Sequence, residues 1–253
     1  MPISYVRSLT TPARSVRGYR HLGIALAFVA GALNAGGYVA VRQYTSHMTG
    51  IVSSAADNLV LGAGDLVLDA LGAILSFLMG AACTAIMVNH ARRRRLASEY
   101  ALPLLLEAIL LLAFGVLGTR LSTVAGLFVP VTVMLLCFMM GLQNAVITKL
   151  SHAEIRTTHI TGVVTDIGIE LGKLLYWNGP QTGTAPRVTA NRARLRVLTL
   201  LAISFFAGGV AGALGFKHLG FSTTIPLAVV LVLLAIVTAA DDLVSAARRA
   251  SQN

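Results

Sequence analysis

The stretch A-L-P-L-L-L-E-A-I-L-L-L-A-F-G-V-L-G-T, residues 101–119, decides the class of fold. Its one ionisable side chain is Glu107, and a helix of this length reaches about 28 Å, close to the ~30 Å thickness of bilayer hydrocarbon. The whole chain of 253 residues is 56% hydrophobic and 12% charged, about half the charged fraction typical of a soluble domain. The sequence therefore predicts an all-α protein embedded in a lipid bilayer.

Six stretches are long and apolar enough to cross a bilayer as helices. They cover residues 20–41, 66–91, 101–119, 124–148, 197–216 and 221–243. Two shorter stretches, 48–62 and 158–177, have a helical pattern that polar side chains interrupt. We predict a polytopic protein with six transmembrane helices and two short polar or re-entrant helices.

Lysine and arginine in short loops set the orientation, because cytoplasmic loops carry an excess of both. With six crossings, 16 of the 20 basic residues share the side of the amino terminus and three lie opposite. If both short helices also crossed, the division would be 11 against eight. The count predicts six crossings with both termini in the cytoplasm. Alternatively, Arg17 and Arg20 ahead of the apolar run 22–32 resemble a cleavable signal peptide.

Short motifs recur in both halves of the chain in the same order. G-A-L-N-A at 31–35 is echoed by G-L-Q-N-A at 141–145, and T-S-H-M-T-G at 45–50 by T-T-H-I-T-G at 157–162, with offsets of 110 and 112. A third echo, with an offset of 128, pairs Ser76, Phe77 and Gly80 with Ser204, Phe205 and Gly208. Three matches in one order predict an internal repeat.

The repeat divides the chain into four parts. These are a basic cytoplasmic tail (1–19), a first membrane repeat (20–119), a second membrane repeat (120–243) and a second cytoplasmic tail (244–253). Because each half has three crossings, the second half enters the membrane upside down. Inverted repeats are typical of secondary transporters, whose binding sites lie near the midplane where interrupted helices meet.

Polar side chains follow one side of the second short helix at helical spacing. They are His159, Asp166, Glu170 and Lys173, with the hydroxyl of Thr161 nearby. One interpretation is a cavity wall that binds a proton, a cation or a polar solute, because ionisable groups within a membrane cost ~2.5 to 3.5 kcal/mol and are retained for function. The other is an amphipathic helix at the inner interface in which Glu170 and Lys173 pair.

The starts of the two short helices supply further candidates for substrate binding. Thr49 and Thr161 stand where free backbone N–H groups and the helix dipole favour an anion, although threonine also caps helices at such positions. Asn34 and Asn144 lie near the ends of crossings and can bind either a substrate or loosened backbone. His47 is a further candidate. Together with His159, Asp166 and Glu170 of the polar stripe, these residues form the predicted substrate-binding set.

Glu107 differs from these residues because only apolar side chains surround it in sequence. We expect it to face the protein interior or to be protonated. Pairing with a hydroxyl or backbone group is the expected explanation, and a role in transport is the alternative.

Several classes of function are excluded. The net charge of +10 suits nucleic acid, but the basic residues lie between apolar runs, and no stretch is polar enough to build a basic folded face. Cys83 and Cys137 lack metal-ligand spacing, and His47 and His159 have no matched third ligand. No phosphate-binding loop, serine-nucleophile elbow or H-E-x-x-H motif is present. We expect no metal, no cofactor and no enzymatic activity; an intramembrane enzyme acting on lipid is the alternative.

The chain resembles the YoaK family of uncharacterised bacterial integral membrane proteins from about Leu22 to Leu243. The motifs that carry the resemblance are S-H-M-T-G at 46–50, Q-N-A at 143–145 and R-T-T-H-I-T-G at 156–162, followed by Thr165-Asp166. Family members often carry Asp where this chain has Asn34, and Asn where it has Ile51, so the first motif here has lost a carboxylate and an amide. The resemblance implies a bacterial inner-membrane location and supplies no activity.

Together these patterns predict a small secondary transporter for a small polar or ionic solute, or for a proton, with its site between the two repeats. The alternative is a non-transporting inner-membrane scaffold or regulatory protein that uses the polar stripe for assembly.

Overall fold

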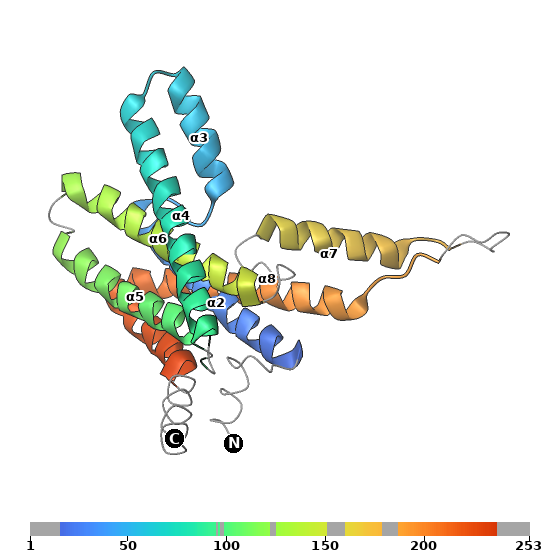
Figure 1. Cartoon of the computed structure of the whole chain (residues 1–253). Coiled ribbons are helices and arrows are strands. Elements are labelled where there is room, and N and C mark those ends of the chain that lie inside the picture. Colours follow the sequence, from blue (N-terminus) through green and yellow to red (C-terminus); the bar gives the residue numbers. More distant parts are fainter. Residues whose placement is uncertain are drawn as a thin grey trace, which may run out of the picture.

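The computed structural model describes residues 16–94, 96, 99–121, 125–150, 160–178 and 187–236, which form helices and their connections (Figure 1). In chain order the helices are α2 (Val16–Val41), α3 (Met48–Val60), α4 (Gly64–Arg93), α5 (Ala101–Leu121), α6 (Ala125–Leu150), α7 (Ile160–Leu175) and α8 (Arg192–Leu219). A short 3-10 turn, η1 (Gly220–Thr223), leads into a further helical stretch over 224–236.

Among the described residues, five helical stretches are long and apolar enough to cross a membrane. They are Leu22–Val41, Gly64–Arg93, Ala101–Thr119, Pro130–Lys149 and Arg192–Ile236. The last of these joins α8, η1 and the helical stretch after it. The predicted multi-pass all-α fold is therefore confirmed. The sixth predicted crossing, 221–243, is helical over 224–236, and its remainder lies outside the described residues.

Helix breaks occur where the backbone requires glycine or a capping side chain. Gly62 between α3 and α4 has φ +74°, and Gly220 after α8 has φ +58°, a left-handed conformation that glycine adopts without steric cost. At the other end of α8, the Asn191 side chain accepts a hydrogen bond from the backbone N–H of Arg194 at 3.0 Å. This cap starts α8 five residues before the predicted crossing at 197, because the apolar pattern alone does not include its first polar turn.

Two long helix pairs form the core of the molecule: α2 packs along α8, and α4 packs along α6. Each pair is held in close contact by two glycines that face backbone carbonyl groups of the opposite helix. The four contacts are Gly31 with Phe205, Gly208 with Phe28, Gly141 with Phe77, and Gly80 with Phe138. Small residues of this kind let helix backbones approach closely in membranes, where packing replaces the hydrophobic effect between helices.

A hydroxyl group links the two helices of each pair. Ser204 Oγ of α8 donates to the backbone carbonyl of Ile24 in α2 at 2.8 Å. Thr84 Oγ1 of α4 donates to the backbone carbonyl of Leu142 in α6 at 2.9 Å. These bonds satisfy hydroxyls that would otherwise be buried without a partner.

Helix α5 lies against α6 and the η1 turn. Phe114 of α5 contacts Phe221 edge-on, with ring centroids 5.5 Å apart, and also contacts Phe216 of α8 at 6.1 Å. This aromatic cluster fixes the carboxyl-terminal half of α5 against the turn that ends α8.

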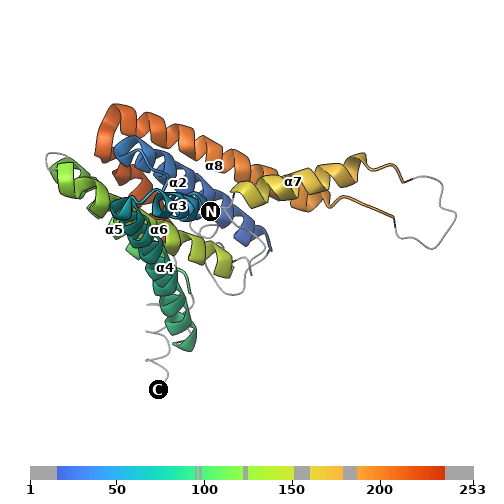
Figure 2. The same ribbon diagram turned by 90° about the horizontal axis from the view of Figure 1, so that it is seen from above.

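The two short polar helices predicted from the sequence are present, and each packs on the long helix that follows it: α3 on α4, and α7 on α8. With 13 and 16 residues, they reach about 20 Å and about 24 Å, less than the thickness of bilayer hydrocarbon. Figures 1 and 2 show the α3–α4 and α7–α8 hairpins leaving the core in different directions, with α3 and α7 apart in both views.

Candidate functional site

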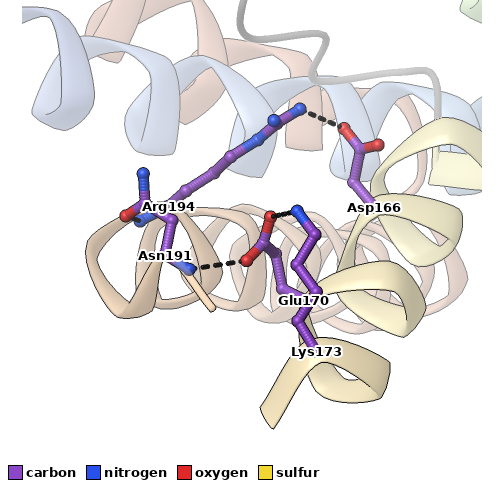
Figure 3. Close-up of polar contacts among 5 residues, drawn as sticks. All are labelled: Asp166, Glu170, Lys173, Asn191 and Arg194. Carbon is purple, nitrogen blue, oxygen red and sulfur yellow. Dashed lines mark hydrogen bonds and ion pairs between the residues drawn. The ribbon is translucent and has the colours of Figure 1, made fainter. Parts of the chain in front are cut away.

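Polar side chains of α7 face the start of α8, where five residues form a connected cluster (Figure 3). Glu170 Oε1 accepts a hydrogen bond from Lys173 Nζ at 2.8 Å, and Glu170 Oε2 accepts one from the backbone N–H of Asn191 at 2.7 Å. Asp166 Oδ2 accepts one from Arg194 Nη2 at 2.9 Å. Both predicted carboxylates are therefore engaged in joining α7 to α8.

The local sequence explains why this cluster forms at the start of α8. Arg192, Arg194 and Arg196 crowd the first turns of that helix, where the positive end of the helix dipole disfavours cations. Asp166 neutralises Arg194, and the Glu170 carboxylate binds the free backbone N–H of the cap residue. The two acids of α7 thus supply the negative charge that the start of α8 lacks.

Glu170 is the best-satisfied carboxylate in this cluster, with its side chain only 3% exposed. The hydrogen bond from Lys173, followed in size by that from the Asn191 N–H, holds the pKa of Glu170 below its ordinary value of 4.5. The pairing of Glu170 with Lys173 was one of the two interpretations of the stripe, and it is confirmed.

The first polar motif lies at the end of α2 and the start of α3. Ser46 Oγ donates a hydrogen bond to Asn34 Oδ1 at 2.8 Å, so Asn34 fixes the loop that connects the two helices. His47 occupies the cap position of α3 with its ring against Gly50, and makes no capping bond through its side chain. Thr49 is exposed within the first turn of α3. The interpretation of Thr49 as a cap is wrong, because His47 holds the cap position and Thr49 is the second residue of the helix.

The remaining predicted residues lie on α6 and at the start of α7. Asn144 is half-buried on α6, and Thr161 is exposed on α7 with its backbone carbonyl accepting the Thr165 hydroxyl at 2.8 Å. His159 lies outside the described residues. The described site residues thus lie on α2 and α3, on α6, and on α7, where Asp166 and Glu170 are joined to α8.

Gln143 and Glu107 are buried polar residues of the membrane spans that were not among the predicted binding residues. Gln143 is fully buried; its Nε2 donates to the backbone carbonyl of Leu26 in α2 at 3.2 Å, while its Oε1 has no hydrogen-bond partner in the described part of the chain. Glu107 is also fully buried, and neither carboxylate oxygen has a partner among the described residues. The pairing expected for Glu107 is therefore wrong. Its isolation within a leucine-rich span was the sequence signal that marked it.

In the ranges that the structure describes, no group of three His, Cys, Asp or Glu side chains is placed to hold a metal ion. Cys83 and Cys137 are free thiols, half-buried and buried respectively.

The fold and its buried polar groups define a multi-pass α-helical membrane protein. The sequence model of one family, described as a protein of unknown function (DUF1275), matches residues 22–237, and the chain belongs to this family. The resemblance to the YoaK family is thereby confirmed. No curated protein and no solved structure matched the chain.

Proposed function

We propose that the protein is a small secondary transporter of the bacterial inner membrane. It moves a small polar or ionic solute across the membrane through a site that lies between two inverted halves. The first half comprises α2 to α5, and the second comprises α6 to the helical stretch over 224–236. Both termini lie in the cytoplasm.

The observation that carries this proposal is the correspondence between the glycine contacts of the two core helix pairs. The sequence offset of 110 takes Gly31 to Gly141, and the offset of 128 takes Phe77 to Phe205. The contact of Gly31 with Phe205 therefore has its counterpart in that of Gly141 with Phe77. The same offsets relate the other two contacts, Gly208 with Phe28 and Gly80 with Phe138. In each pair, one helix belongs to the first half and the other to the second half. An approximate two-fold axis that relates the two halves accounts for all four glycine contacts.

The charges of the two hairpins support an inverted arrangement. Residues 48–80, in α3 and the first part of α4, carry three Asp and no Lys or Arg. Residues 160–196, from α7 into α8, carry five Lys or Arg and two acidic residues. Because basic loops remain in the cytoplasm, this difference supports the proposal that the two hairpin ends lie on opposite sides of the membrane, as inverted halves require.

The contact between α2 and α6 is the best candidate for the centre of the transport path. These are the first helices of the two halves, so an approximate two-fold axis passes between them. Gln143 lies at this contact, and its amide oxygen, which has no hydrogen-bond partner in the described structure, is available to a polar solute. Asn34 and Asn144 lie on the same two helices, with His47 and Thr49 on the α3 side and Thr161, Asp166 and Glu170 on the α7 side; His159, also proposed for the site, lies outside the described residues.

Uptake by the purified protein in proteoliposomes tests this function. We expect at least one member of a panel of small polar solutes to accumulate above protein-free liposomes. Gln143→Leu should reduce that uptake, because it removes the amide without changing the size of the side chain greatly. Asn58→Ala is the matched control, since this amide lies at the end of α3 and binds only Ser54 at 3.2 Å among the described residues. Equal uptake by liposomes with and without protein would contradict the proposal.

The alternative of a non-transporting scaffold draws on the same polar stripe. Glu170 and Lys173, the residues assigned to partner binding in that alternative, bind each other and Asn191 within the chain. The scaffold would gain support if a stoichiometric partner copurified and were lost on Glu170→Gln.

A further inference from the structure

Glu107 is the one described acidic residue that is both buried and unpaired. It lies six residues into the membrane span Ala101–Thr119, about 9 Å along the helix axis. The other described acids are either exposed, as Asp57, Asp65 and Asp69 are, or engaged by cations, as Glu99 is with Arg92 at 2.7 Å.

The surroundings of Glu107 are apolar on its own helix. One turn away on the same face lie Leu104 and Leu111, and Ala108 is adjacent; all three are buried to 1% exposure or less. The span contains no other ionisable residue.

The elements packed on α5 do not pair Glu107 with a cation within the described structure. Helix α6 carries the buried thiol of Cys137 and, in its last turn, Lys149. The described part of η1 and of the stretch over 224–236 has no charged residue. Helix α4 brings Arg92, whose guanidinium binds Glu99 and contacts the hydroxyl of Tyr100.

From this geometry we propose that Glu107 is a proton-binding site inside the membrane, occupied by a proton in the conformation described. A carboxylate buried without a donor is strongly disfavoured relative to the neutral acid. The proton can leave only when the side chain gains water or a cation, so its release requires a second conformation that hydrates this part of α5. If the protein is a transporter as proposed above, Glu107 is the residue that couples solute movement to protons.

Labelling with the hydrophobic reagent dicyclohexylcarbodiimide tests the protonation directly, because carbodiimides react with protonated carboxyl groups in apolar surroundings. The full-length protein in lipid nanodiscs is treated across a pH series, and the modified residues are mapped by mass spectrometry of peptides. We expect Glu107 to be labelled, and the label to fall about tenfold per pH unit above its titration midpoint. Glu170, an ionised carboxylate bound to Lys173 and Asn191, is the internal control and should remain unlabelled.

Infrared spectroscopy gives a second measurement that does not depend on reagent access. The carbonyl band of a protonated carboxylic acid should be present in the wild type and absent in Glu107→Gln, whose neutral side chain should leave the fold intact. No label on Glu107 at any pH, together with identical spectra in this region, would overturn the proposal. If Glu107 is labelled but proteoliposomes move no solute, the proton site stands and the transporter proposal fails.

Discussion

Replacement of Gly208 by alanine should separate α8 from α2. The new Cβ would overlap the backbone carbonyl of Phe28, and this carbonyl belongs to a helix, so it cannot rotate aside as a side chain could. Overpacking of this kind costs about 1–3 kcal/mol, whereas alanine itself favours a helix over glycine by about 0.5–1 kcal/mol. We expect a net loss of about 0.5–2 kcal/mol.

Two glycines of α7 provide the matched control. A Cβ at Gly168 or Gly172 meets no atom within 4 Å. Gly168→Ala should therefore add only the preference of alanine over glycine in a helix, and should stabilise the protein by about 0.5–1 kcal/mol. Gly80→Ala, the counterpart of Gly208→Ala in the other half, faces the Phe138 carbonyl and should destabilise by a similar amount.

Thermal unfolding in detergent measures these effects with a thiol-reactive fluorophore. Cys137 is buried and Cys83 half-buried, so unfolding exposes both native thiols. For a chain of this size, 1 kcal/mol corresponds to about 2–4 °C in melting temperature. A melting temperature of Gly208→Ala that equals or exceeds the wild type would refute the close packing of α2 on α8.

Three further predictions concern the joint between α7 and α8. A double-mutant cycle of Asp166→Asn and Arg194→Gln should give a coupling energy of about 0.2–1 kcal/mol, because both side chains are partly exposed; a coupling of zero would remove this pair from the joint. For Glu170 the pKa is lowered in the folded state, so its stabilising effect is present above its ordinary value of 4.5 and is lost as the pH falls through the folded pKa. The melting temperature of the wild type should accordingly exceed that of Glu170→Gln at neutral pH, and the difference should close on acidification; a constant difference would contradict this. Asn191→Ala should cost about 0.5–2 kcal/mol by removing the cap of α8, whereas Asn191→Asp should retain most of the stability.

The positions of the membrane helices were predictable because long apolar runs leave few alternatives in a bilayer. Both short helices were also predicted to within two residues at each end: 48–62 became Met48–Val60, and 158–177 became Ile160–Leu175. The start of α8 was not predicted, because its first turn is polar. That turn depends on the Asn191 cap and not on the spacing of hydrophobic residues. Capping requires a particular backbone geometry, which composition does not specify.

The side-chain contacts were harder to predict than the helices. Spacing along α7 indicated the pair of Glu170 with Lys173, but not the bonds to Asn191 and Arg194, which lie 21 and 28 residues further along from their partners. Those bonds depend on how the α7–α8 hairpin closes. Glu107 was expected to find a partner because buried acids usually do; its isolation is a property of packing between helices, which no pattern within α5 records.

Cysteine accessibility at the two hairpin ends tests most directly whether the halves are inverted. In a background without Cys83 and Cys137, Asp57→Cys marks the end of α3 and Arg192→Cys marks the start of α8; both native side chains are exposed. A membrane-impermeant maleimide should label position 57 only from outside intact cells, and position 192 only in inside-out vesicles. Labelling of both positions from the same side would contradict the inverted arrangement and, with it, the proposed transport mechanism.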